Sequence, residues 1–306
     1  MNKFIVTTSI NKPTKAIRIF DSLKDWKLIV VGDKKTPKNY KLKNGIYLTT
    51  KDQVKIDKEL SNLIGWNCIE RRNFGFIFAK KLGAKIVATV DDDNIPLKNW
   101  GQNLLINKKT NVKKINIHDD VFDPLFPTNY KNLWHRGFPL DRIDNRSIKS
   151  ITSEIITPKI QADFWNGDPD IDCIARVMFK PSCKFNNKYF PFFSTKISPF
   201  NTQNTFIDAS LLKDYFLFPG VGRMHDIWAS YYLQYKKKVK IVYGKPSVFQ
   251  ERNIHTTQKD LIDEFVGIKK NNNFINQIIN KNFKLKNFFS KSSIESFKLY
   301  RKHFQI

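Results

Sequence analysis

The sequence has few cysteines, no long apolar run and no glycine-rich phosphate loop, and each absence excludes a class of protein. Its three cysteines, Cys68, Cys173 and Cys183, are odd in number and lack the spacing of metal ligands. Neither a disulfide framework nor a cysteine-based zinc site is therefore expected. No run of about 18 apolar residues and no signal-peptide pattern occurs in the sequence. We expect a soluble, cytoplasmic protein.

The loops that usually cradle phosphates are missing as well. Neither G-x-G-x-x-G nor G-x-x-x-x-G-K-[ST] is present, which argues against dinucleotide-binding and P-loop proteins. A phosphate site in this chain would have to be built differently, for example around a metal ion held by carboxylates.

Basic residues far outnumber acidic ones. The 306 residues include 53 Lys plus Arg against 28 Asp plus Glu, so the net charge is +25. Such a charge suits an anionic partner, for example a nucleotide, an acidic lipid surface, an acidic glycan or nucleic acid. A composition that is rich in Lys throughout explains the same charge without any partner. The two interpretations carry equal weight at this stage.

The most informative stretch is K-I-V-A-T-V-D-D-D-N, residues 85–94. Its continuous, β-branched apolar run predicts a strand that is buried on both faces. Asp91, Asp92 and Asp93 follow at the carboxyl end of this strand, where open α/β sheets bind ligands. Because three adjacent carboxylates repel one another, we expect a hard divalent cation, Mn²⁺ or Mg²⁺, among them. The structural alternative is an acidic turn with a capping aspartate.

The N-terminal residues predict a βαβ unit, which favours a parallel sheet. Residues 3–9 form an apolar run that passes into small hydroxyl residues, and residues 27–31 form a second run, with helical spacing between the two. Thr7 and Thr8 therefore lie at an open strand end and are candidates for nucleotide binding. Asp33 follows the second strand, where an acidic side chain commonly meets a ribose or base edge. A role as an ordinary turn residue is equally consistent with its position.

Residues 70–82 predict a helix that leads directly into the acidic strand end, because apolar residues recur four apart on one face. Arg72 and Asn73 lie in its first turn, where free amides and the helix dipole favour anions. We expect these two residues to contact a phosphate or uracil group. A solvated basic turn is the alternative.

Five further motifs follow in order along the chain. They are H-D-D-V-F-D-P-L-F-P at 118–127, W-H-R-G-F-P-L-D-R at 134–142, D-F-W-N-G-D-P-D-I-D at 163–172, F-P-G-V-G-R-M-H-D-I-W at 218–228 and Q-E-R-N-I-H at 250–255. Together with D-D-D-N, this ordered set resembles the plant reversibly glycosylated polypeptides (UDP-arabinopyranose mutases) and the related domain of the STELLO Golgi proteins.

The resemblance covers residues 4–255 and implies a GT-A fold, which is an α/β, Rossmann-like fold of nucleotide-diphosphosugar transferases. It implies a catalytic domain over residues 1–255, with a nucleotide-binding half (1–117) and an acceptor half (118–255). Residues 256–306 would form a basic helical C-terminal extension. The implied reaction is a metal-dependent transfer of a sugar from a UDP-sugar to a glycan or lipid-linked acceptor.

The same resemblance assigns roles to individual acids. Asp91 and Asp93 are the expected metal and ribose ligands, and Asp92 is expected to turn inward beside them; which acid takes which role is left open. In GT-A enzymes a C-terminal His commonly completes the metal site, and His255 is the candidate here. Asp226 begins a helical pattern and is expected to act as the acceptor-activating base or to bind sugar hydroxyls, with a helix N-cap as the alternative.

In the mutases an arginine receives the sugar and returns it. Arg142 is the nearest match to that position and Arg136 is the second, although R-G-F-P-L-D-R is one residue shorter than the corresponding mutase motif. Because a guanidinium group stays protonated at neutral pH, it is a poor nucleophile. We therefore expect transfer to an external acceptor, and we keep a mutase-like, self-glycosylating protein as the alternative.

Five more residues are candidates for substrate binding within these motifs. Trp165 offers an apolar face on which a sugar ring can stack, and the other four lie in turns or near a helix start. The four are Asp168, Asp170, Gly222 and His225. The alternative is that all five are ordinary core or loop residues.

From residue 257 onward the composition changes to alternating Lys and Phe. The pattern predicts three amphipathic helices, over residues 261–268, 274–279 and 294–304. A basic helix with aromatic residues is typical of peripheral contact with an anionic membrane. It is equally typical of a helical cap on the sheet, which we favour because a cap needs no partner.

A function of another class also fits the charge, namely a basic membrane- or nucleic-acid-associated binding module whose acids are incidental. That interpretation leaves unexplained why acidic residues gather at a strand end. We therefore prefer the glycosyltransferase, and we do not expect nucleic acid as a partner.

Overall fold

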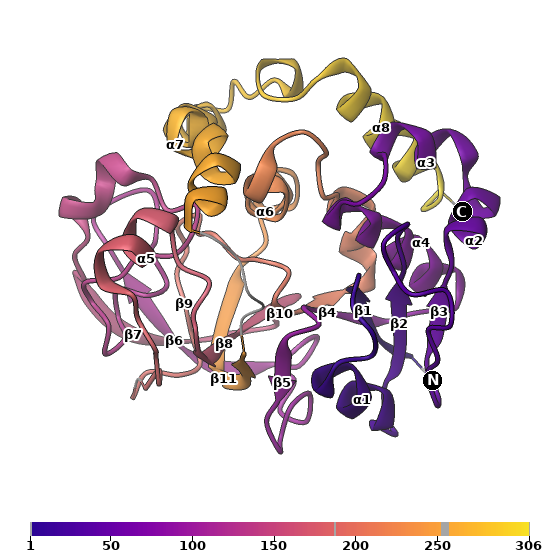
Figure 1. Cartoon of the computed structure of the whole chain (residues 1–306). Coiled ribbons are helices and arrows are strands. Elements are labelled where there is room, and N and C mark those ends of the chain that lie inside the picture. The colour runs from indigo at the N-terminus through magenta and orange to yellow at the C-terminus, as the bar shows by residue number, and fades with distance from the viewer. Residues whose placement is uncertain (1, 187, 252–256, 306) are drawn as a thin grey trace.

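A computed structural model describes residues 2–186, 188–251 and 257–305 of the chain. One mixed β-sheet runs through the whole molecule (Figure 1). Its strands lie in the order β3-β2-β1-β4-β10-β8-β11-β9-β6-β7, and β5 pairs with β11 beside this path. The strands are β1 (Lys3–Thr8), β2 (Lys27–Val31), β3 (Ile46–Leu48), β4 (Ile86–Val90), β5 (Asn94–Pro96), β6 (Thr110–Asn116), β7 (Ser150–Ile156), β8 (Ile160–Gly167), β9 (Phe192–Phe193), β10 (Asn204–Asp208) and β11 (Ile241–Gln250).

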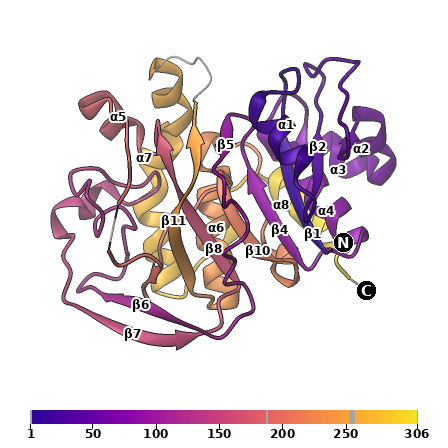
Figure 2. The same ribbon diagram turned by 90° about the horizontal axis from the view of Figure 1, so that it is seen from below.

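Helices cover both faces of this sheet (Figures 1 and 2). The α-helices are α1 (Lys15–Ser22), α2 (Thr50–Ile56), α3 (Lys58–Ile64), α4 (Arg72–Lys81), α5 (Cys173–Phe179), α6 (His225–Lys237), α7 (Thr257–Ile279) and α8 (Lys291–Lys302). Short 3₁₀ helices are η1 (Ile69–Arg71), η2 (Leu140–Asn145), η3 (Ala209–Asp214), η4 (Gly222–Met224) and η5 (Leu285–Asn287).

The first half of the chain forms the parallel part of the sheet. Strand β1 lies between β2 and β4, and β3 extends the edge in parallel with β2. Helices α1 and α4 pack on opposite faces of these strands (Figure 1). Helix α4 approaches closely because Gly75 carries no side chain: a Cβ there would lie 2.4 Å from Val6 Cγ1. The predicted α/β fold with a Rossmann-like first half is confirmed.

The second half of the chain is built differently. Strand β10 pairs antiparallel with β4, with Asn204 opposite Val90, and also pairs antiparallel with β8. The residues just before β10 therefore lie beside the acidic end of β4. Strand β6 lies next to the far edge of the sheet, paired with β7 and β9.

The C-terminal extension packs as a helical cap. Residues 261–268 and 274–279 were expected as two helices, but they form the single helix α7, and α8 follows. Several aromatic side chains of this extension are buried; among them, Phe274 packs against Trp228 and Phe289 packs against Phe218. Of the helices that the structure describes, none is both long and apolar enough to cross a bilayer.

The first turns of α7 expose apolar side chains and bury acidic ones. Phe265 and Ile268 are 60% and 39% exposed, whereas Asp260 and Glu264 are buried. The cause is electrostatic, because Arg223 forms ion pairs with both acids from beneath the helix. The orientation of this segment therefore follows from its ion pairs rather than from its apolar spacing.

Candidate active site

Two adjoining pockets open at the carboxyl end of β4. The first pocket, of about 670 Å³, is lined by the ends of β1 and β2, by the segment before α4 and by Asp91, Asp92 and Asp93. The second pocket, of about 290 Å³, is lined by the loops before β10 and α6 and by the first turns of α7. Asp91 and Asp93 line both pockets. The acids that the sequence singled out therefore stand where the two pockets meet.

The three acids of the triplet differ in their surroundings. The carboxylate of Asp92 accepts hydrogen bonds from Ser9 Oγ at 2.5 Å and from Asn11 Nδ2 at 3.1 Å, so it fixes the loop after β1. Asp91 pairs with Arg72, with 2.7 Å between Oδ1 and Nη2. Burial raises the pKa of Asp91 above its ordinary value, and the Arg72 charge opposes that shift.

Arg72 lies at the start of α4 and is almost fully buried. Besides Asp91, its guanidinium donates to Thr8 Oγ1 at 3.3 Å, to Thr89 Oγ1 at 3.2 Å and to the carbonyl of Thr202 at 3.0 Å. It thereby links three strand ends, those of β1, β4 and β10. Arg72 therefore sets the position of Asp91 at the boundary between the pockets.

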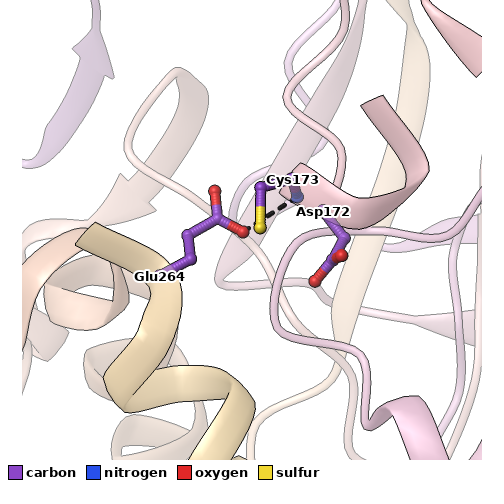
Figure 3. Close-up of side chains that lie close together, drawn as sticks. All are labelled: Asp172, Cys173 and Glu264. Carbon is purple, nitrogen blue, oxygen red and sulfur yellow. Dashed lines mark hydrogen bonds between the residues drawn. The ribbon is translucent and has the colours of Figure 1, made fainter. Parts of the chain in front are cut away.

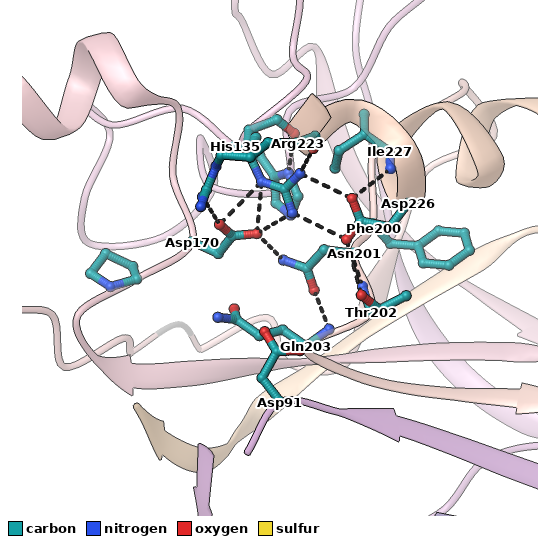
Figure 4. Close-up of polar contacts among 12 residues, drawn as sticks. Asp91, His135, Asp170, Phe200, Asn201, Thr202, Gln203, Arg223, Asp226 and Ile227 are labelled. Carbon is teal, nitrogen blue, oxygen red and sulfur yellow. Dashed lines mark hydrogen bonds and ion pairs between the residues drawn. The ribbon is translucent and has the colours of Figure 1, made fainter. Parts of the chain in front are cut away.

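A second arginine, Arg136, organises the wall of the second pocket, and its partners Asp170 and Asp226 are labelled in Figure 4. Arg136 donates through Nε and Nη2 to Asp170, with the shortest bond 2.7 Å, and through Nη1 and Nη2 to Asp226, at 2.9 and 3.1 Å. Its Nη1 also donates to the carbonyl of Arg223. These contacts use all five N–H groups of a guanidinium. Arg136 thus joins three loops that are distant in the sequence.

The carboxylate of Asp226 is held in its charged form by its surroundings. Burial alone would raise the pKa of Asp226, but the charges of Arg136 and His225 and the hydrogen bonds from Arg136 together outweigh burial and lower that pKa below its ordinary value. Burial acts against the charge of Arg136 too, yet Asp170 and Asp226 raise its pKa well above the ordinary value. Asp226 also accepts hydrogen bonds from the backbone N–H groups of Thr202 and Ile227.

Arg223 connects the same network to α7. Its guanidinium forms ion pairs with Asp170 at 3.1 Å, with Asp260 at 3.3 Å and with Glu264 at 2.7 Å. The side chain is 23% exposed and lines the second pocket. Asp260 and Asp263 of α7 line that pocket as well. The C-terminal extension therefore contributes directly to the candidate site.

Several other residues singled out in the sequence also reach the pockets. Thr8 and Asp33 line the first pocket, and Asp33 Oδ2 accepts a hydrogen bond from the backbone N–H of Cys68 at 3.0 Å. His225 lines the second pocket, where its Nδ1 lies 2.8 Å from the carbonyl oxygen of Gly222. His255, the candidate metal ligand, falls outside the described residues.

In the described part of the chain (residues 2–186, 188–251 and 257–305), six other candidates line neither pocket. They are Thr7, Asn73, Arg142, Trp165, Asp168 and Gly222.

Each of the four larger side chains in that set has partners elsewhere. Asn73 is bound to the backbone of Leu217, at 2.9 and 3.0 Å. Arg142 pairs with Asp119 and donates to Asn276 Oδ1 at 2.9 Å. Trp165 packs among Phe164, Phe185 and His135 in the core, and Asp168 pairs with Arg176.

The two small residues of the set have backbone roles. Thr7 is fully buried within β1. Gly222 has a positive φ of 56°, and a Cβ there would lie 2.0 Å from the carbonyl oxygen of Asp263. Glycine is therefore needed at this position for the close approach of α7.

The structure adds pocket residues that the sequence did not single out. Ser9 and Asn11 position Asp92, while Thr202, Gln203 and Gln250 line the second pocket. The sequence signal for Ser9 was its place at the open end of the first strand. No signal existed for Thr202 and Gln203, because only the antiparallel pairing of β10 with β4 brings them to the acids.

Another group of metal-ligating side chains lies apart from the acid triplet. Asp172, Cys173 and Glu264 bring their ligand atoms within 4.8 Å of one another (Figure 3). Glu264 accepts from the backbone N–H of Cys173 at 2.9 Å and from Arg223, and Asp172 caps α5 through the N–H of Ile174. Burial raises the pKa of Asp172 to about 7 and raises that of the Cys173 thiol above its ordinary value. These contacts tie α5 to α7.

Both pockets are acidic, although the whole chain is strongly basic. Among the described residues, the second pocket is lined by six aspartates against Arg136, Arg223 and Lys259, and the first by four aspartates against Arg72. A bare diphosphate would be repelled by such a lining, whereas a divalent cation would be attracted. The oxygen-rich donor set therefore fits a hard metal ion that carries a phosphate ligand.

Comparison with known proteins identifies the class that the chain resembles, namely glycosyltransferases of the STELLO type. Two curated relatives, both named as probable glycosyltransferases of Arabidopsis thaliana, are 24% identical to it. The match to STELLO1 spans 227 residues, 68% of this chain and 29% of the relative. The match to STELLO2 spans 184 residues, 56% of this chain and 24% of the relative. The chain thus covers only about a quarter of each relative.

Among solved structures, glucosyl-3-phosphoglycerate synthase from Mycobacterium tuberculosis aligns with a TM-score of 0.42 and 12% identity, over 92% of this chain and 79% of that chain. A mycobacterial protein aligns with the same score at 10% identity. At these scores the structural matches say nothing about the reaction. No protein-family model matches the sequence.

Proposed function

We propose that this chain is a metal-dependent glycosyltransferase that moves a sugar from a nucleoside diphosphate sugar, with UDP as the nucleotide, to a hydroxyl group of a glycan or similar acceptor. The observation that carries the proposal is the shared boundary of the two pockets, where Asp91 and Asp93 face both. A donor that lies across this boundary has its nucleotide in the first pocket and its sugar in the second. The likeness to the STELLO proteins supports the same class of reaction.

Asp91 and Asp93 are the residues that would hold Mn²⁺ or Mg²⁺ in this proposal. When bound, the ion supplies Lewis-acid charge that stabilises a diphosphate leaving group. Asp92 acts on the site indirectly, because its bonds to Ser9 and Asn11 hold the loop that borders the first pocket. Arg72 orients Asp91 through its ion pair and opposes the effect of burial on the pKa of Asp91.

The first pocket suits a nucleoside. Asp33 at the end of β2 offers a carboxylate to ribose hydroxyls or to a base edge, and Thr8 lies at the adjacent strand end. The segment around Cys68 and Ile69 completes the wall on the α4 side. In this proposal the pocket binds the nucleoside, and the acids at its inner end face the diphosphate.

Asp226 works through Arg136 in this proposal. Its two oxygens already accept hydrogen bonds from Arg136, Thr202 and Ile227, and its pKa is lowered, so it is a weak proton acceptor. Its role is then to hold Arg136 and the pocket wall in place. This differs from the role as a base that its position in the sequence indicated.

The self-glycosylating alternative receives less support. A nucleophilic arginine must lose its proton, but Asp170 and Asp226 raise the pKa of Arg136. Arg142 is engaged with Asp119 and Asn276 away from the two pockets. Sugar transfer to an external hydroxyl requires neither arginine to react.

The experiment is incubation of the chain with UDP-sugars and Mn²⁺, followed by two measurements. Release of UDP, by hydrolysis or by transfer to added sugar acceptors, supports the glycosyltransferase. Mass spectrometry of the intact protein tests the alternative. If the protein gains the mass of one sugar, and if this gain is absent in Arg142→Ala and reversed by added UDP, the mutase interpretation is correct and the transferase interpretation is wrong.

A further inference from the structure

Two buried glutamines of the second pocket have amide oxygens that lack a partner. Gln203 and Gln250 are 4% and 3% exposed, and both line the second pocket together with Asp91 and Asp93. Within the part of the chain that the structure describes, neither Oε1 atom accepts a hydrogen bond. An unsatisfied buried polar atom costs about 1–3 kcal/mol, so such atoms call for an explanation.

Other buried glutamines of the chain do not share this property. The amide oxygen of Gln53 accepts from Arg71 Nε at 2.7 Å, that of Gln161 from the N–H of Leu105 at 2.8 Å, and that of Gln234 from the N–H of Ser198 at 3.0 Å. The two glutamines without a partner for Oε1 both face the pocket. Their common feature is therefore the pocket itself.

The backbone of both residues is firmly held. Gln250 pairs with Asn94 across β11 and β5, and Asn94 follows Asp93 directly. The side chain of Asn94 donates to the carbonyl of Gln203 at 2.6 Å, and the N–H of Gln203 donates to Asn201 Oδ1 at 3.1 Å. In Figure 4 the Gln203 side chain lies beside Asp91. These backbone contacts therefore fix the positions from which the two amide side chains reach the pocket.

We propose that Gln203 and Gln250 bind the hydroxyl groups of the transferred sugar; this inference rests on the proposed glycosyltransferase function. A sugar hydroxyl donates to the amide oxygen, and the amide NH₂ group can donate to the neighbouring hydroxyl. A sugar presents such adjacent hydroxyls, whereas a phosphate offers acceptors only.

A divalent cation is a poorer occupant for these oxygens. The second pocket already contains six aspartates, and a hard cation binds carboxylates in preference to neutral amides when both are in reach. Neutral amides also add no charge to a pocket that is acidic, so they suit an uncharged sugar. The two glutamines then distinguish the sugar part of the donor from its nucleotide part.

The test compares UDP with UDP-sugars in the presence of Mn²⁺. Binding of UDP, UDP-glucose, UDP-galactose and UDP-arabinopyranose is measured by calorimetry for the wild type, Gln203→Leu and Gln250→Leu. We expect each leucine variant to lose about tenfold in affinity for the UDP-sugar that the wild type binds best, which corresponds to one lost hydrogen-bonded hydroxyl. Affinity for UDP should stay within about twofold of the wild type.

Gln161→Leu is the matched control, because it removes a buried glutamine whose two ends are hydrogen-bonded away from the second pocket. It should lower the melting temperature without changing the ratio of UDP-sugar to UDP affinity. If a leucine variant does not fold, Gln203→Asn and Gln250→Asn take its place, because they retract the amide while keeping its polarity.

The outcomes separate the two claims. Failure of the wild type to bind UDP overturns the proposed function, and this inference with it. If the protein binds UDP tightly but both glutamine variants keep the wild-type ratio of UDP-sugar affinity to UDP affinity, the inference alone is overturned. The inference is also overturned if no UDP-sugar binds more tightly than UDP. It is overturned as well if the glutamine variants bind Mn²⁺ more weakly while their ratio of UDP-sugar affinity to UDP affinity stays that of the wild type.

Discussion

Arg136 and Asp226 form a two-point buried ion pair, with 2.9 Å between Nη1 and Oδ1 and 3.1 Å between Nη2 and Oδ2. The two residues are 90 positions apart in the sequence. Their pairing joins the R-G-F-P segment to the first turn of α6, and Asp170 completes the arrangement from the loop after β8. The wall of the second pocket depends on this pairing.

The first prediction concerns the stability of this pair. Arg136→Met should lower the free energy of unfolding by about 3–5 kcal/mol, because it leaves Asp170 and Asp226 buried without their cation. Urea denaturation measures the change. Arg142→Met is the control, since its partly exposed ion pair should contribute about 1 kcal/mol or less. Equal losses in the two variants would contradict the role given to Arg136.

The second prediction concerns Asp226 and pH. Because its pKa is lowered, Asp226 stays ionised across the neutral range, and any stability it contributes is lost only as pH falls below its ordinary range. Asp226→Asn should therefore reduce the turnover of UDP-sugar without altering the shape of the pH–rate profile between about pH 5.5 and 9. Loss of one limb of the profile in this variant would restore Asp226 as the catalytic base.

The third prediction concerns Asp163 on β8. Burial raises its pKa from 3.8 to about 7, and the hydrogen bonds from Gln161 and Ser247 offset this only in part. The unfolded chain therefore releases the proton of Asp163 at lower pH than the folded chain does, so this residue makes the protein less stable as pH rises from about 4 to about 7. Asp163→Asn should raise the melting temperature more at pH 8 than at pH 4.5.

Asp208 on β10 serves as a control because its pKa is shifted in the opposite direction from that of Asp163. Burial would raise its pKa, but hydrogen bonds from Ser210 and Asn107 outweigh burial and lower it. Asp208→Asn should therefore destabilise the protein, and the loss should shrink as the solution is acidified below pH 4. A pH-independent difference between Asp163→Asn and the wild type would contradict the third prediction.

The sequence predicted the first half of the fold well, for a physical reason. Strands β2 and β4 match the predicted ranges because continuous apolar runs are buried in the interior of the sheet. The acid triplet was also placed correctly at a strand end. Both features depend on local sequence alone.

The wall of the second pocket could not be predicted from local sequence to the same extent. Arg136, Asp170 and Asp226 were each singled out, but their mutual contacts depend on loops brought together by the sheet order. Trp165 was expected to meet a sugar, yet it packs in the aromatic core, because its strand is covered on both faces. Gln203 carried no signal, since the antiparallel insertion of β10 beside β4 cannot be deduced from spacing.

The fourth prediction concerns the C-terminal cap. Phe297 on α8 is buried against Phe216 and Phe218, and Tyr300 donates to the carbonyls of Leu212 and Tyr215. Phe297→Ala should lower the free energy of unfolding by about 3–5 kcal/mol.

Deletion of residues 280–306 tests the same cap more severely and should yield a protein that melts earlier or is insoluble. The membrane-facing alternative would be favoured by two results together: the full chain binds anionic liposomes, and the deletion variant is equally stable but no longer binds them.

The central claim is that Asp91 and Asp93 hold a divalent cation that allows an acidic site to bind a diphosphate. Calorimetric titration of UDP into the chain, with Mn²⁺ and with chelator, tests it most directly, with Asp93→Ala measured in parallel. We predict that chelator weakens UDP binding at least about tenfold, and that Asp93→Ala binds equally weakly with and without Mn²⁺. Equal UDP affinity of the wild type with and without the metal, or unchanged metal dependence in Asp93→Ala, would contradict the account.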